Sequence, residues 1–194
     1  MMDVSTRARA AFVVFAGFLF LALTPHASAQ SEQDRRDCFS SDSRNYEDPN
    51  FYDIGLAACE RFIQSRRYRG KDLAYYVRQK ANWLHRKKDY NGALREFAYA
   101  IELDPNHVES YDYRADVFLD LGQYDRAVEE YNKAIRVDPD YPAAYYSRGR
   151  ALEKLGKLDD AVASYKLSLE VPSKNRIGDW AHTEARKRLQ ELGR

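Results

Sequence analysis

The residues of this chain that could carry chemistry are two cysteines, four histidines and a few pairs of adjacent carboxylates. They stand in no familiar catalytic pattern, since the sequence has no G-x-S-x-G, no H-E-x-x-H, no phosphate-binding glycine loop and no dinucleotide fingerprint. His85, His107 and His182 lie far apart in the chain, and two cysteines with no nearby histidine are too few ligands for a metal. We therefore expect no catalytic residue, no metal, no cofactor and no enzymatic activity.

The acidic pairs Glu129–Glu130 and Asp159–Asp160 could in principle act as acid and base. Both pairs lie in segments whose apolar residues recur at the three- and four-residue steps of an amphipathic helix. We therefore expect them to be solvated residues and helix caps.

The N-terminal segment has the pattern of an export signal. Arg7 and Arg9 form a short positive region, an apolar run covers 10–23, and the small-x-small motif of residues 27–29 follows. The run is short for a membrane span, which needs about 20 residues. We predict a cleavable signal peptide over 1–29 and a secreted or periplasmic protein of a Gram-negative envelope, with no stable membrane insertion after cleavage. An uncleaved N-terminal anchor is the alternative.

Both cysteines, Cys38 and Cys59, follow the predicted leader. In an oxidising compartment an even number of cysteines favours a disulfide. A disulfide between them would close a loop, with 20 residues between the two cysteines. Closing such a loop would stabilise the fold by about 3 kcal/mol in the chain-entropy model. We predict a Cys38–Cys59 disulfide, with two unpaired thiols as the alternative.

The charge balance argues against a polyanionic partner. Without residues 1–29 the chain has 29 basic and 29 acidic side chains, which leaves no net charge. Nucleic-acid binding relies on an excess of Lys and Arg against phosphates, and attachment to anionic lipid relies on the same excess. We therefore expect neither partner.

The sequence repeats itself with a period of 34 residues. Three sets of residues recur with this period. Two sets are small and one is aromatic: Ala81, Ala115 and Gly149; Ala93, Ala127 and Ala161; and Phe97, Tyr131 and Tyr165. Small side chains let two helices cross closely, and an aromatic side chain can fill the wedge between one helix pair and the next. One pair cannot cover its own apolar face, so the pairs must stack.

Local signals divide each unit into two helices. In the middle unit Gly122 suits a left-handed C-cap, Asp125 is placed to cap the following helix, and Asp138-Pro139 ends it. After the third unit, Asp179 is placed to cap a last helix over about 179–192.

This spacing resembles the tetratricopeptide repeat (TPR). The resemblance implies an all-α, right-handed α-solenoid with repeats at 74–107, 108–141 and 142–175, and a capping helix within 176–194. Ala58 to Phe62 echoes Ala93 to Phe97, so we expect a degenerate cap or half repeat over 30–73. We expect this cap to contain a short helix near 32–39 and a helix from about 51 to 66, joined by the disulfide.

In TPR proteins the first helices of successive repeats line a concave groove, which binds a partner protein or peptide. Carried over by repeat position, the groove residues are Tyr75, Arg78, Asn82, His85, Glu109, Asp112, Tyr113, Asp116, Tyr146 and Arg150.

Arg78 and Asn82 match in type two positions of the carboxylate clamp by which some TPR proteins hold acidic C-terminal tails. Tyr113 departs from that clamp, as do Ala143 and Ser147. Since Asp112 and Asp116 would repel an acidic tail, we expect a partner peptide of basic character. The alternative is that many of these charges only keep the surface soluble.

The resulting expectation is a non-catalytic periplasmic scaffold or adaptor. The alternatives are a membrane-tethered assembly factor of the envelope, a non-catalytic subunit of an envelope enzyme, and a self-associating structural protein. The oligomeric state and the identity of the partner do not follow from the sequence.

Overall fold

The computed structural model describes residues 25–39 and 50–194, with side chains from residue 31 onward. Most of the predicted leader lies outside these residues. Within the two ranges the chain forms nine helices and no strand, which confirms the all-α expectation. The helices are α1 (Pro25–Cys38), α2 (Phe51–Gln64), α3 (Gly70–Arg86), α4 (Tyr90–Leu103), α5 (Val108–Asp120), α6 (Tyr124–Val137), α7 (Pro142–Lys154), α8 (Leu158–Glu170) and α9 (Arg176–Glu191).

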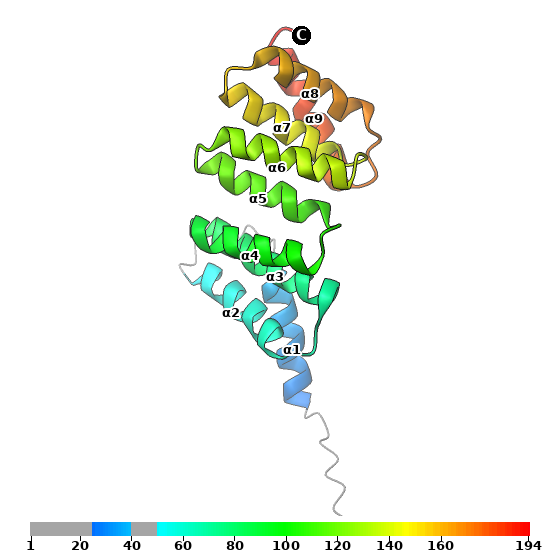
Figure 1. Ribbon diagram of the computed structural model, residues 1–194. Helices are drawn as coiled ribbons and strands as arrows, with labels where there is room; N and C mark the ends of the chain where they lie inside the picture. The colour runs from blue at the N-terminus through cyan, green and yellow to red at the C-terminus, as the bar shows by residue number, and fades with distance from the viewer. Residues whose placement is uncertain (1–24, 40–49) are drawn as a thin grey trace, which may run out of the picture.

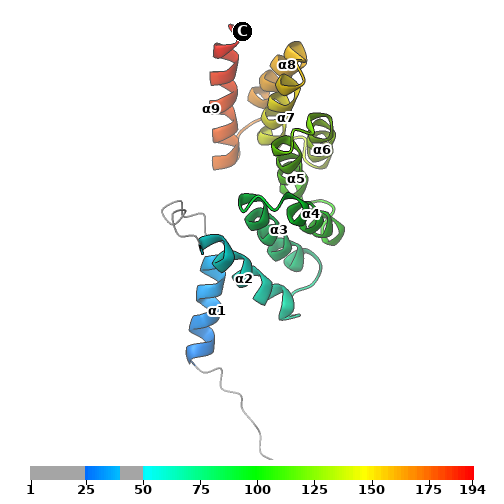
Figure 2. The same ribbon diagram turned by 90° about the vertical axis from the view of Figure 1, so that its left-hand side faces the viewer.

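The helices stack as antiparallel pairs along one axis, from α1 and α2 at one end to α9 at the other (Figure 1). Seen from the side, α3, α5 and α7 form one row of the stack and α4, α6 and α8 form the other (Figure 2). We call these the inner and the outer row. Helix α9 packs on both α7 and α8 and closes the stack. The chain is therefore an α-solenoid, as predicted.

The core of the stack lies between the two rows and is built by the repeated residues. Phe97, Tyr131 and Tyr165 have no exposed side-chain surface. Gly149 is needed where α7 crosses α8, because a Cβ atom there would lie 2.5 Å from a ring carbon of Tyr165. Ser168 replaces the repeated alanine of α8 and donates a hydrogen bond to the Pro142 carbonyl at 2.9 Å. Its hydroxyl is thus satisfied although it is buried.

Helix α1 begins at Pro25, earlier than the predicted start near residue 32. The disulfide Cys38–Cys59 is present and joins the end of α1 to α2. The Trp83 indole of α3 donates a hydrogen bond to the Cys38 carbonyl at 2.9 Å. Its ring covers Gly55 of α2 so closely that a Cβ atom there would lie 2.3 Å from it. The disulfide and Trp83 together attach this N-terminal cap to the first full helix pair.

Two predicted helix caps are wrong. Helix α6 begins at Tyr124, so Asp125 lies inside the first turn, and Gln123 stands at the N-cap without a side-chain hydrogen bond. Helix α9 begins at Arg176, because the Asn175 side chain accepts hydrogen bonds from the backbone of residues 177 and 178. Asp179 instead accepts a hydrogen bond from Ser173 at 2.6 Å. The left-handed Gly122 and the end of α6 before Asp138 are confirmed.

The expectation that both acidic pairs are solvated is wrong for Glu130. Its carboxylate is buried between α5 and α6, where Arg114 donates to it at 2.6 Å and Lys133 at 2.7 Å. Arg114 lies on α5, 16 residues before Glu130 on α6, so the pairing depends on the packing of these two helices. Glu129, Asp159 and Asp160 are exposed as expected.

None of the helices in the described part of the chain has the length and apolar character needed to cross a membrane.

Candidate functional site

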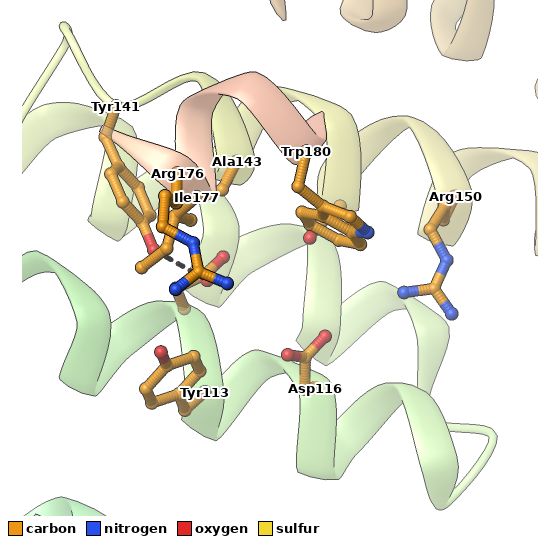
Figure 3. Close-up of a pocket in the computed structure, with 10 residues that line it drawn as sticks. Tyr113, Asp116, Tyr141, Ala143, Arg150, Arg176, Ile177 and Trp180 are labelled. Atoms are coloured by element: carbon orange, nitrogen blue, oxygen red, sulfur yellow. Dashed lines mark hydrogen bonds between the residues drawn. The ribbon is translucent and has the colours of Figure 1, made fainter. Parts of the chain in front are cut away.

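A cavity of about 600 Å³ lies between α5, α7 and α9, on the inner row of the stack (Figure 3). Its lining combines aromatic rings with charges of both signs, which is the composition of many ligand sites. The lining residues are Asp112, Tyr113, Asp116, Tyr141, Ala143, Ser147, Arg150, Arg176, Ile177 and Trp180.

Asp112 is a carboxyl group of the cavity wall that its surroundings satisfy poorly. Its side chain is 3% exposed, its Oδ2 atom accepts a long hydrogen bond from the Tyr141 hydroxyl at 3.4 Å, and its Oδ1 atom has no hydrogen-bond partner among the described residues. Burial, and then the charge of Asp116, raises the pKa of Asp112 well above its ordinary value. The described residues therefore do little to stabilise the ionised form of Asp112.

Asp116 lies one helical turn further along α5 and is better satisfied. The hydroxyl of Tyr131, the buried aromatic residue of α6, donates to its Oδ1 atom at 2.7 Å. Burial raises the pKa of Asp116, while the Tyr131 hydrogen bond and the positive charge of Arg150 oppose that rise. Figure 3 shows its carboxylate pointing from α5 toward the Trp180 ring on α9.

Aromatic rings and one buried arginine continue from the cavity toward the N-terminal cap. The Arg78 guanidinium lies 5.9 Å from the centre of the Tyr113 ring and 5.3 Å from that of Tyr75. Tyr75 in turn stacks on Phe39, which follows α1, with ring centres 4.7 Å apart. The Nε atom of Arg78 has no hydrogen-bond partner among the described residues, and the two ring faces stabilise its charge instead.

The remaining predicted groove residues of α3 and α5 lie beside this row. His85 pairs with Asp120 across the two helices at 2.8 Å. Glu109 pairs with His107 at 2.9 Å, and this contact lowers the pKa of Glu109. Asn82 is half-buried on α3.

The predicted residues of α7 are covered by α9. Tyr146, which we predicted to line the groove, is buried with its ring centre 5.1 Å from that of Trp180 in an edge-on arrangement. Arg150 is half-buried and its guanidinium lies 6.0 Å from the centre of the Tyr146 ring. Exposed aromatic surface at this end of the row therefore belongs to Trp180.

The structure thus brings four of the ten predicted residues into the cavity, namely Asp112, Tyr113, Asp116 and Arg150. The sequence reasoning missed the wall supplied by α9, which consists of Arg176, Ile177 and Trp180. The signal for it was present. The 34-residue register places Ile177 and Trp180 at groove-facing positions of an incomplete fourth unit that begins at residue 176.

Three repeat-family models match the sequence. One, described as "TPR repeat", covers residues 115–156, and two, described as "Tetratricopeptide repeat", cover 96–129 and 142–175. No curated protein matches the chain in sequence.

Solved TPR domains resemble the fold. The TPR domain of Arabidopsis OM64 is 28% identical with a TM-score of 0.50, and the match covers 59% of this chain and 95% of that one. The first TPR domain of Spaghetti (RPAP3), bound to the HSP90 peptide SRMEEVD, is 26% identical with a TM-score of 0.54, covering 66% and 99%. The N-terminal domain of stress-induced protein-1 from C. elegans is 26% identical with a TM-score of 0.54, covering 64% and 97%.

The repeated sequence, the stacked helix pairs and these matches agree over the middle of the molecule. Residues 96–175 of the chain therefore consist of tetratricopeptide repeats, which the three family models match.

Proposed function

We propose that this chain is a non-catalytic scaffold that binds a partner protein or peptide along its inner row. The observation that carries the proposal is the row of aromatic and charged side chains that leads from Tyr75 through Arg78 and Tyr113 into the cavity. Aromatic side chains and arginine are the residues that contribute most to protein interfaces. A similar TPR domain has been solved with a bound peptide, which supports the same use of the inner row here.

Photo-crosslinking from the inner and the outer row tests this proposal. Tyr75 on α3 is 46% exposed and Tyr99 on α4 is 41% exposed, so they form a matched pair of positions. With a photoreactive phenylalanine in place of either tyrosine, we expect a discrete crosslinked partner in living cells from position 75 and none from position 99. Equal crosslinking from both positions, or crosslinking from position 99 alone, would contradict the inner row as the binding surface.

We also propose that the protein works in the periplasm after its leader has been removed. The Cys38–Cys59 disulfide supports this location, because disulfides persist in oxidising compartments. The predicted cut after Ala29 falls inside α1, so the mature chain would begin at Gln30 within that helix. N-terminal sequencing of the exported protein tests the proposal, and an intact N-terminus would favour the anchored alternative.

A further inference from the structure

We propose that the cavity between α5, α7 and α9 receives one positively charged side chain, a lysine or an arginine, from a protein partner, and that Asp112 recognises it. The inference deepens the proposed function and depends on peptide binding along the inner row.

The first argument is the charge that the fold leaves unbalanced. Arg78 and Asp112 are both more than nine-tenths buried and each has a polar atom without a partner among the described residues. The Arg78 charge is stabilised by the faces of Tyr75 and Tyr113. Asp112 accepts only the long hydrogen bond from Tyr141, and the nearby Asp116 adds a charge of the same sign that the weaker attraction of Arg150 does not offset. A cation in the cavity would stabilise both carboxylates at once.

The arginines of the cavity wall do not supply that cation. Arg176 is exposed at the start of α9, where water and salt screen its charge. Arg150 is half-buried and its attraction to Asp116 does not outweigh the effect of burial on the pKa of that carboxyl. The most deeply buried charged side chain of the cavity is therefore the acidic Asp112, and the most exposed is the basic Arg176. That distribution favours a ligand that places its positive end deep in the cavity.

The second argument is the shape and lining of the space. A volume of about 600 Å³ lies within the range of small-ligand sites and admits one long side chain. Trp180 and Tyr113 offer aromatic surface, and cations bind favourably over such rings within about 6 Å of their centres. In Figure 3 the Trp180 ring and the Asp116 carboxylate face one another across the cavity. A guanidinium or ammonium group between them would contact a ring and reach toward the carboxylates.

Short peptides and the two tryptophans of the chain provide the test. The probes are acetylated, amidated pentapeptides of alanine with arginine at the centre, and the same peptides with citrulline or glutamate there. Citrulline has nearly the shape of arginine without its charge. In nitrogen–proton NMR spectra we expect the arginine peptide to shift the indole signal of Trp180. The indole of Trp83, which is buried where α3 packs on the N-terminal cap, should not shift. Citrulline should weaken binding at least tenfold.

Asp112→Asn and a matched control assign the effect to one residue. The asparagine variant should lose at least tenfold in affinity for the arginine peptide without any loss of thermal stability. Glu129→Gln removes the same charge from an exposed position on α6 and should leave the affinity unchanged. The comparison of arginine with citrulline on the unmodified protein needs no variant, so it decides the question even if Asp112→Asn folds poorly.

Equal binding of the arginine and citrulline peptides, tighter binding of the glutamate peptide, or unchanged affinity in Asp112→Asn would each overturn the inference. None of these results would touch the proposed function, which crosslinking from position 75 tests separately. If no peptide shifts the Trp180 signal at millimolar concentration, the inference is also overturned. The scaffold proposal then fails only if crosslinking from position 75 recovers no partner.

Discussion

Reduction of the Cys38–Cys59 disulfide should destabilise the N-terminal cap and leave the repeats folded. The two cysteines are separated by 21 residues, and a cross-link that closes a loop of this length stabilises the fold by about 3 kcal/mol in the chain-entropy model. In a stack of helix pairs each pair contacts only its neighbours, so the end of the stack can open separately. The loss should therefore be confined to α1, α2 and their contacts with α3.

Tryptophan fluorescence can report this opening directly. Trp83 is 2% exposed and donates a hydrogen bond to the Cys38 carbonyl, whereas Trp180 lies on α9, away from the N-terminal cap. In a Trp180→Phe background the emission therefore reports the cap alone. With a slope of about 1–3 kcal/mol per molar urea for small proteins, a loss of 3 kcal/mol lowers the midpoint of unfolding by about 1–3 M urea.

A double variant, Cys38→Ala with Cys59→Ala, provides the control, because its urea midpoint should not respond to reductant. Alkylation before and after reduction should show that both thiols of the unmodified protein become accessible only after reduction. An unchanged Trp83 midpoint in the reduced protein would refute the reasoning, since the cap would then be held by its apolar contacts alone. A midpoint that falls equally for a reporter at Trp180 would refute the separate opening of the cap.

Three further predictions concern the repeats. Gly149→Ala should destabilise the fold by about 1–3 kcal/mol in thermal or urea unfolding, because its Cβ atom would overlap the Tyr165 ring. Burial raises the pKa of Asp112 above its ordinary 3.8, so the free energy of unfolding should fall as the pH rises from that value through the folded pKa. Asp112→Asn should lack this fall and exceed the unmodified protein in stability by about 1–3 kcal/mol above the folded pKa. Tyr131→Phe removes the donor to Asp116 and should raise the pKa of that carboxyl further in carbon-13 NMR titrations, at a loss of about 1 kcal/mol.

The sequence predicted the stack well because the period is carried by residues that fill its interior. Ala127, Tyr131 and their counterparts must recur wherever one helix pair packs on the next, so their spacing fixes both helices and their order. The sequence predicted the ends of the helices less accurately. Asp125 and Asp179 were plausible caps by type, but the backbone starts each helix earlier.

The site was predicted in part for a similar reason. The repeat positions identified Asp112, Tyr113 and Asp116 on α5, because equivalent positions of the first helix lie on the same side of every repeat. They did not indicate that α9 would cover Tyr146 and bring Trp180 to the cavity, since α9 continues the register without completing a unit. The burial of Asp112 also escaped prediction, because Tyr141, which packs against it, is distant in sequence.

Helix α9 has a consequence for how the molecule reaches its folded state. Ala181, Ala185 and Leu189 of this helix are buried against α7 and α8, and Arg188 pairs with Glu153 of α7. A ribosome adds these residues only after α7 and α8 have been made. Until they arrive, the last full helix pair exposes an apolar face that another growing chain could cover in the same way. A message truncated before α9 should therefore give aggregating chains, and the time that a growing chain spends without α9 is the time in which neighbouring copies can compete with its own α9.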